Sequence, residues 1–310
     1  MVNNRFLIGH YGRYDRQKQT RDFREGFYGV ELCSFNNEED IKAIVKDATA
    51  QDFNYGIHLP LRSGRWRLRD AQYLSKSSQC QKESYSYMED EIAYACKYHP
   101  DYILFHFPKP MLLDTRVDWS NWRFADSSEH YWENEYPYQL FLEECNNFFT
   151  WLRRQAELYK FVPVLEFDLV NKYIYNNEEF YQLFSAYPEI KVCLDIARLH
   201  VQRVLDKYFP VDCFIKQYAR HTYLVHLSNV SVKKKINHYP ALPTLDPDEG
   251  WADIKMYLQK IKSENNQFKL LFEHWSNAVN EQQLQECYDW ITEILAEEKG
   301  KVNEQDQSIY

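Results

Sequence analysis

The sequence predicts one (β/α)8 barrel, and three observations support this fold class. Eight short apolar runs recur along the 310-residue chain. Helical patterns lie between them, and six of the runs end in a single His, Glu or Asp. Strands of a buried parallel sheet are apolar, whereas the functional side chains of a barrel stand at the C-terminal ends of its strands. The predicted strands span residues 6–9, 29–33, 55–58, 102–106, 162–166, 192–195, 223–226 and 270–273.

Three stretches between these runs have the apolar spacing of amphipathic helices. Asn37 is a candidate N-cap for the first of them. The three apolar faces are Ile41, Ile44, Val45 and Ala48; Leu142, Cys145, Phe149, Leu152 and Ala156; and Leu284, Cys287, Ile291 and Ile294. Alternating strands and helices form either a closed barrel or a large open sheet, and polar residues at the ends of many strands favour the barrel.

Length and composition are consistent with one large domain. Barrels of roughly 250 residues fold as single units, and 45% of the residues in this chain are hydrophobic. We predict that residues 1–297 form the barrel domain. Residues 298–310 contain few apolar side chains, so we predict a disordered C-terminal tail there.

Composition also predicts the cellular compartment. No apolar stretch approaches the roughly 18–20 residues of a membrane span, and the first residues lack the long apolar stretch of a signal peptide. The seven cysteines include no CxxC pair, which is typical of free thiols in a reducing cytoplasm. The net charge of −9 argues against broad affinity for nucleic acids or membranes, although it leaves room for a local basic patch.

Four successive strands end in side chains that bind divalent metals. They are Glu166, Asp195, His226 and Glu273. Hard and borderline divalent ions prefer carboxylate oxygens and imidazole nitrogens. Each residue alone has an ordinary structural explanation, because a Glu can pair with an Arg and a His can be hydrogen-bonded in the core. Their occurrence at consecutive strand ends favours a metal site in the mouth of the barrel.

Two connections, at residues 60–84 and 107–136, are longer than a barrel needs. Each follows a strand that ends in a histidine, His58 or His106, and the second contains Trp119. Long loops at this end of a barrel commonly cover the substrate. The alternative is a surface insertion whose aromatic side chains pack on the rim of the barrel.

The order of these motifs resembles the xylose isomerase-like TIM barrels. This superfamily contains sugar isomerases and epimerases, and also the AP endonucleases of family 2, which include the endonuclease IV type. The resemblance covers nearly the whole chain. Its residues are Glu31 in GVELC, His58 in IHLP, His106 in FHFP, Glu166 in LEF, Asp195 in CLDIARLH, His226 in VHLSN, His238 in NHYPALP and Glu273 in FEH.

The resemblance implies one divalent metal ion (Mn, Mg, Co or Zn) bound by Glu166, Asp195, His226 and Glu273. It implies a role in carbohydrate metabolism, with a small carbohydrate substrate. The implied reaction is an isomerisation or epimerisation by proton transfer through an enediolate. Glu166 and Glu273 would be the catalytic acid and base.

Other features that the resemblance implies stay open. His58, His106 and His238 would either bind a second metal or hydrogen-bond the substrate. Many relatives carry a His where this chain has Arg198. An arginine cannot ligate a metal and would repel one, which argues against the third zinc ion of the endonuclease type. Barrels of this kind often associate, so a homo-oligomer is also open.

Arg198 has a second chemical interpretation, because an arginine at the barrel mouth can hold a phosphate or a carboxylate. Arg62, Arg65, Arg67 and Arg69 in the third loop could do the same. We predict that the substrate is bound by Arg198, His200, Arg62 and Trp119. The competing explanation is that these arginines form a solvated face.

Three functions remain open at this point. A metal-dependent sugar or sugar-phosphate isomerase or epimerase is the favoured one. A zinc-dependent phosphodiesterase of the AP endonuclease type is supported by His58, His106 and the RSGRWRLRD loop. A barrel that binds a small ligand without turnover is supported by the departures from common patterns at Arg198 and Phe167.

Overall fold

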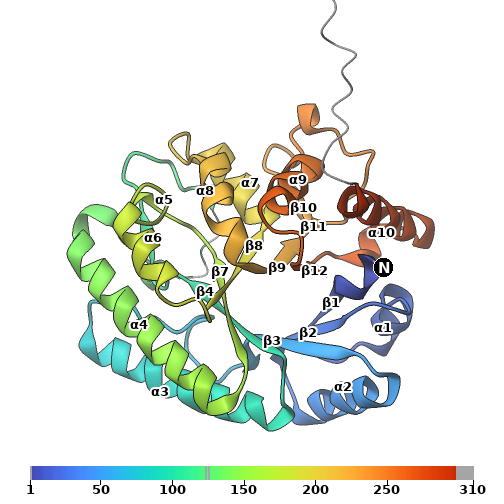
Figure 1. Cartoon of the computed structure of the whole chain (residues 1–310), viewed down its shortest axis with the longest axis horizontal. Helices are drawn as coiled ribbons and strands as arrows, with labels where there is room; N and C mark the ends of the chain where they lie inside the picture. The colour runs from blue at the N-terminus through green and yellow to red at the C-terminus, as the bar shows by residue number, and fades with distance from the viewer. Residues whose placement is uncertain (1, 123, 125, 298–310) are drawn as a thin grey trace, which may run out of the picture.

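The chain forms a closed barrel of parallel strands surrounded by helices (Figure 1). The computed structural model describes residues 2–122, 124 and 126–297, so the tail predicted at residues 298–310 lies outside the described residues. Within the described part of the chain, no helix has the length and hydropathy needed to cross a membrane. All seven cysteines are free thiols.

The predicted strands are all present, which confirms the (β/α)8 barrel. Among the described residues they close the barrel in the order β1-β12-β9-β8-β7-β4-β3-β2. Neighbouring barrel strands are parallel, so their C-terminal ends meet in one mouth. The barrel strands are β1 (Phe6–Tyr11), β2 (Gly29–Phe35), β3 (Asn54–Arg62), β4 (Tyr102–Phe107), β7 (Val162–Phe167), β8 (Lys191–Asp195), β9 (Thr222–Leu227) and β12 (Lys269–Phe272).

Helices cover the outside of the barrel, and α3 and α4 lie side by side at its lower left in Figure 1. The three predicted amphipathic helices are α2, α4 and α10. Asn37 caps α2 as predicted, since its side chain accepts a hydrogen bond from the backbone N–H of Asp40. The helices are α1 (Arg16–Asp22), α2 (Glu38–Gln51), α3 (Ser78–Ala95), α4 (Tyr138–Tyr159), α5 (Lys172–Tyr175), α6 (Glu178–Ser185), α7 (Ile196–Leu205), α8 (Val211–Tyr218), α9 (Ile254–Glu264) and α10 (Glu281–Ala296).

An apolar layer inside the barrel supports the mouth. Successive side chains of a strand point to opposite faces, so residues two apart share a face. Leu104, Val164, Leu224 and Leu271 are fully buried and pack together inside the barrel. Each of them stands two positions before a polar residue of the mouth, in the order His106, Glu166, His226 and Glu273. The apolar layer is therefore the floor on which the polar residues stand.

The long connection at residues 107–136 packs on the rim of the barrel. It contains two short paired strands, β5 (Met111–Leu113) and β6 (His130–Trp132). Trp119 is buried against the β5 side chains, and its indole Nε1 donates to the backbone oxygen of Asp114 at 3.0 Å. This packing is consistent with the rim-packing alternative, and a substrate contact for Trp119 stays a prediction. A further hairpin follows β9 and consists of β10 (Asn229–Ser231) and β11 (Ile236–Tyr239).

Candidate metal centre

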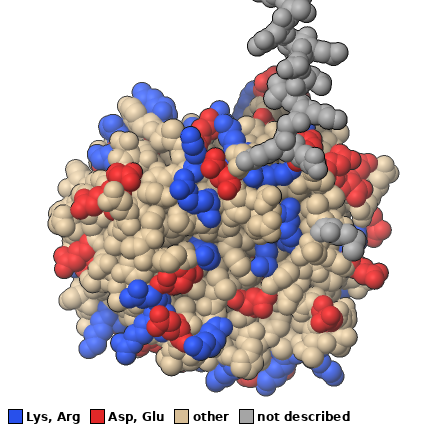
Figure 2. All heavy atoms as spheres, viewed as in Figure 1, with Lys and Arg blue, Asp and Glu red and all other residues tan. Residues whose placement is uncertain are grey.

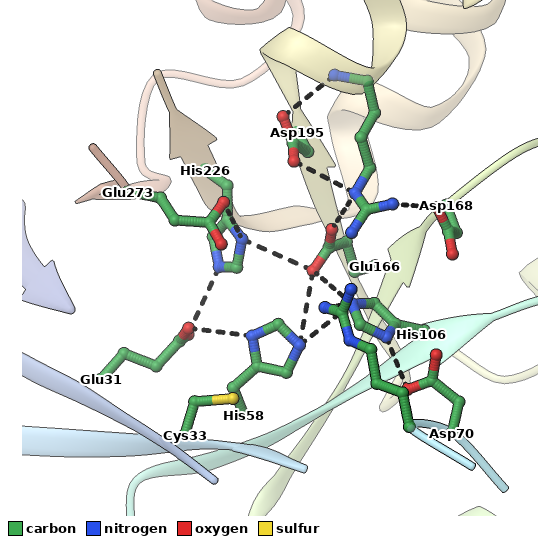
Figure 3. A network of polar contacts seen from close by, with 12 residues as sticks. Glu31, Cys33, His58, Asp70, His106, Glu166, Asp168, Asp195, His226 and Glu273 are labelled. Carbon is green, nitrogen blue, oxygen red and sulfur yellow. Dashed lines mark hydrogen bonds and ion pairs between the residues drawn. The ribbon is translucent and has the colours of Figure 1, made fainter. Parts of the chain in front are cut away.

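The strand register brings the predicted ligands to one level of the mouth. On adjacent strands, His106 lies beside Glu166, and Asp195 lies beside His226. Glu273 follows the last residue of β12. Carboxylates and imidazoles from distant parts of the sequence therefore point toward one another in the mouth (Figure 3).

His226 lies at the centre of the predicted ligand set. Its Nδ1 is 3.5 Å from Oε2 of Glu166 and 3.5 Å from Oε2 of Glu273. Asp195, His226 and Glu273 each offer one ligand atom, and these atoms lie within 4.8 Å of one another. The Glu166 and His226 side chains are buried, whereas the side chain of Glu273 is 31% exposed. Glu273 is thus the member of the set that solvent or a substrate can reach.

The donor atoms fit a divalent cation. Nδ1 of His226 and Oε2 of Glu166 are buried without a hydrogen-bond partner in the part of the chain that the structure describes. Buried polar atoms without a partner are costly, and a cation between them would remove that cost. Oxygen and imidazole donors suit magnesium, manganese, cobalt or zinc.

Glu31, on β2, orients two of the histidines. Its Oε1 is 3.3 Å from Nδ1 of His58, and its Oε2 is 3.4 Å from Nε2 of His226. The hydroxyl of Tyr102 donates to Oε2 of Glu31 at 2.8 Å. With one ring nitrogen held by Glu31, each histidine turns its other nitrogen toward Glu166. Outer carboxylates commonly fix metal-binding imidazoles in this way.

Tyr102 can reach Glu31 because Gly56, on the neighbouring strand β3, has no side chain. A Cβ at position 56 would lie 2.0 Å from Cζ of Tyr102. We expect Gly56→Ala to lower the free energy of unfolding by about 2 kcal/mol, because a buried ring must move. Metal affinity should also fall, because Glu31 loses a donor. Gly9→Ala is the control, since its Cβ would meet only Leu271 at 4.0 Å. Urea denaturation and metal titration measure both effects, and equal values for the two variants would contradict this account.

His58 and His106 form a second group of metal-type donors beside Glu166. The Nε2 atoms of the two histidines are 3.0 Å apart. Nε2 of His106 is also 3.5 Å from Oε2 of Glu166. These three residues satisfy the spacing of a ligand triad. A second ion here would share Glu166 with the first site.

A buried charged network supports this second group, and three of its members, Asp70, Lys109 and Asp168, were not predicted. Nδ1 of His106 is 2.7 Å from Oδ1 of Asp70. Nζ of Lys109 is 3.0 Å from Asp70 and 2.6 Å from Asp168. Lys109 follows the fourth strand, and Asp168 lies two positions after Glu166. Their closeness to strand ends was the signal that could have identified them.

Arg198 is held by three carboxylates of the site. Its Nε is 2.8 Å from Glu166 and 3.2 Å from Asp195, and its Nη1 donates to Asp168. The guanidinium therefore supplies positive charge to the acidic cluster. A substrate contact for Arg198 stays a prediction. Two of its guanidinium nitrogens, Nε and Nη1, are already engaged by these carboxylates.

Burial and neighbouring charges set the protonation of the site. Burial, together with the charge of Glu273, raises the pKa of Asp195 to about 6. Burial alone would raise the pKa of Glu273, but the imidazole of His226, 3.5 Å away, lowers it to about 2. Burial would also raise the pKa of Glu166, but Arg198 and neighbouring histidines lower it well below the usual range. Glu166 and Glu273 are thus ionised at neutral pH, as a ligand or a base must be.

The structure places the other predicted residues around this cluster. Nδ1 of His238 is 3.2 Å from the backbone oxygen of Glu273, so His238 lies at the edge of the site. His200 is partly buried on α7. Nε of Arg62 is 2.6 Å from Oε1 of the buried Glu91. Trp119 lies in the rim cluster described above, away from the pocket described next.

A pocket lined by arginines opens beside the cluster, and we call it the arginine pocket. It has a volume of about 530 Å³ and lies at the C-terminal ends of β1, β2 and β3. Arg69 lines it, and Nη2 of Arg69 is 3.1 Å from Nε2 of His106. The pocket and the candidate metal centre are therefore neighbours. The other arginines in its lining are Arg13, Arg62 and Arg65.

The fold and the mouth define a class of protein: a (β/α)8 barrel whose C-terminal strand ends carry a cluster of acids and histidines. No protein-family model and no curated protein sequence matches the chain. Solved structures do match it over most of its length.

A D-tagatose 3-epimerase-like protein is 12% identical with a TM-score of 0.61, and the match covers 93% of this chain and 96% of that protein. A protein of Thermus thermophilus, TTHB071, soaked with ZnCl2, is 15% identical with a TM-score of 0.57. The match covers 93% of this chain and 98% of that protein. An L-ribulose 3-epimerase is 13% identical with a TM-score of 0.56, and the match covers 93% of this chain and 94% of that protein. The chain therefore has the fold of the xylose isomerase-like TIM barrels, as its sequence predicts.

Proposed function

We propose that this chain is a divalent-metal-dependent isomerase or epimerase of a small carbohydrate. The observation that carries the proposal is the pair of ionised carboxylates, Glu166 and Glu273, which both approach Nδ1 of His226 to 3.5 Å. Two such groups can accept and return a proton. The similarity to a D-tagatose 3-epimerase-like protein and an L-ribulose 3-epimerase supports a sugar as the substrate.

The metal would be held by Glu166, Asp195, His226 and Glu273. The similar protein that was soaked with ZnCl2 supports a metal in this fold. When bound, a divalent ion supplies positive charge that polarises the carbonyl and hydroxyl oxygens of the substrate.

The side chains of the mouth then divide the proton transfer between them. Glu273 is ionised and 31% exposed, so it accepts the proton from the carbon next to the substrate carbonyl. Glu166, on the other side of His226, is ionised at rest, so it first takes up a proton from solvent and then delivers it to that carbon or its neighbour, while Glu273 releases its proton to solvent. The ion pair with Arg198 fixes Oε1 of Glu166 and leaves Oε2 directed into the site. The apolar floor of the barrel excludes water from below.

Deuterium exchange tests this proposal. The protein, loaded separately with Mn, Mg, Co or Zn, is incubated in D2O with a panel of ketoses, aldoses and their monophosphates. NMR should show deuterium at the carbon next to the carbonyl of at least one sugar. A chelator should abolish the exchange, and added metal should restore it. Absence of exchange for every sugar with every metal would contradict the proposal.

A second candidate function, a zinc phosphodiesterase acting on nucleic acid, is favoured by the triad of His58, His106 and Glu166. Counting metal ions per chain by mass spectrometry separates the two functions. One ion per chain supports the single site around His226. Two or three zinc ions would assign His58 and His106 as ligands, and cleavage of DNA with abasic sites would then be the assay.

A further inference from the structure

We propose that the arginine pocket binds the phosphate group of a phosphorylated sugar. This proposal rests on the proposed function and specifies its substrate class. The pocket is concave, and its volume of about 530 Å³ lies within the range of small-molecule sites. It opens at the same end of the barrel as the candidate metal centre.

Two arginines of the pocket are free to bind an anion. Arg62 is paired with the buried Glu91, and Arg13 with Asp15. Arg65 and Arg69 make no ion pair in the described ranges, and both are solvent-exposed within the pocket lining. The described lining includes no carboxylate, and Asp70, whose charge acts on Arg69, is already paired with His106 and Lys109. A guanidinium presents a planar fork of N–H donors, which matches the oxygens of a phosphate.

The remaining lining suits a phosphorylated sugar. Ser34, Asn36 and Ser63 offer neutral hydrogen-bonding groups beside the arginines. Tyr11, which is 73% exposed, stands in the lining and presents a flat apolar face of the kind that covers C–H groups of a sugar. The indole of Trp66 is stacked on Tyr87, with ring centroids 4.9 Å apart, and this pair forms a fixed wall.

Arg69 joins the arginine pocket to the reacting groups. Its Nη2 is 3.1 Å from Nε2 of His106, and that nitrogen is 3.5 Å from Oε2 of Glu166. One substrate can therefore place its phosphate against Arg65 and Arg69 while its carbonyl end lies beside Glu166. Arg198 is a weaker candidate for the phosphate, because three carboxylates already hold it.

The surface favours a small anion over a nucleic acid. Phosphate backbones bind to extended areas of Lys and Arg. The face in Figure 2 instead interleaves Lys and Arg with Asp and Glu, and the net charge of the chain is −9. A recessed pocket with two unpaired arginines fits a single phosphate monoester.

Calorimetric titration of the metal-loaded full chain with inorganic phosphate, at constant ionic strength, tests the pocket directly. Wild type, Arg65→Gln, Arg69→Gln and Arg153→Gln are compared. Arg153 is a surface arginine 3.6 Å from Glu189 and serves as the matched control. We expect wild type and Arg153→Gln to bind alike, and each pocket variant to raise the Kd by roughly tenfold, because a charge-assisted hydrogen bond is lost. Thermal melting confirms that all four proteins are folded.

Three results would overturn the proposal. The first is the absence of phosphate binding to folded wild type. The second is binding that survives unchanged in both pocket variants, which would place the ion elsewhere, including at the metal. Tight binding of a single-stranded oligonucleotide that depends on Arg65 and Arg69 would also overturn it, in favour of nucleic acid.

Exchange assays separate this proposal from the proposed function. If phosphorylated sugars exchange deuterium with a lower KM than their unphosphorylated counterparts, and Arg65→Gln removes the difference, both proposals are supported. If phosphate binds in the pocket but no sugar exchanges, the phosphate site stands and the isomerase proposal fails. If unphosphorylated sugars exchange equally well, the isomerase proposal stands and the phosphate subsite fails.

Discussion

Glu273→Gln is expected to lower the rate of deuterium exchange by about 10²–10⁴-fold, the usual contribution of a general base. The amide keeps the shape of the side chain but cannot accept a proton. The effect on stability should be small, since the side chain is 31% exposed. Exchange is followed by NMR with the sugar that wild type turns over fastest.

Because Glu273 is also a proposed ligand, metal content must be measured on the same samples and the rate expressed per bound ion. Glu143→Gln, on the exposed face of α4, is the control and should exchange at the wild-type rate. A Glu273→Gln protein that retains both its metal and its exchange rate would refute the role of Glu273 as the base.

Arg198→Met is expected to lower the free energy of unfolding of the metal-free protein by about 3 kcal/mol. The substitution keeps an apolar stem but removes the charge that pairs with Glu166, Asp168 and Asp195. Three buried carboxylates then lose their shared cation, although Lys109 still holds Asp168. Urea denaturation in the presence of a chelator measures the loss.

Metal should restore part of the stability of Arg198→Met, because a bound divalent ion supplies the missing positive charge and stabilises the folded state. Arg153→Met is the control, since an exposed ion pair contributes less than about 1 kcal/mol. An Arg198→Met protein as stable as wild type without metal would show that the guanidinium does not compensate the acidic cluster.

The barrel was predictable because its strands have a simple signature. The runs that end at His58, His106, Glu166 and His226 are apolar up to the polar residue, and the alternation of a pleated strand then places these residues on one face. A closed parallel barrel brings the ends of its strands to one mouth. The local sequence pattern and the barrel topology were therefore enough to predict that these four residues lie together in the mouth.

The charged network behind the mouth could not be predicted in the same way. Asp70 lies in a loop, and its contacts with His106 and Lys109 depend on how that loop folds over the strand ends. A loop residue carries no periodicity that would indicate its direction. Trp119 shows the same limit, because the sequence allowed either a substrate contact or packing on the rim; its ring packs against the β5 side chains, and a substrate contact for Trp119 stays a prediction.

The arginine pocket is built from the first three barrel strands, whereas Glu166, Asp195, His226 and Glu273 come from the last four in the chain. Loop residues 63–69 can therefore change without altering the strand register that aligns the acids. Under our two proposals, one set of residues recognises the phosphate end of the substrate, and a different set carries out proton transfer next to its carbonyl. Exchanging that loop would retarget such an enzyme toward a differently charged sugar while its proton-transfer machinery stays in place.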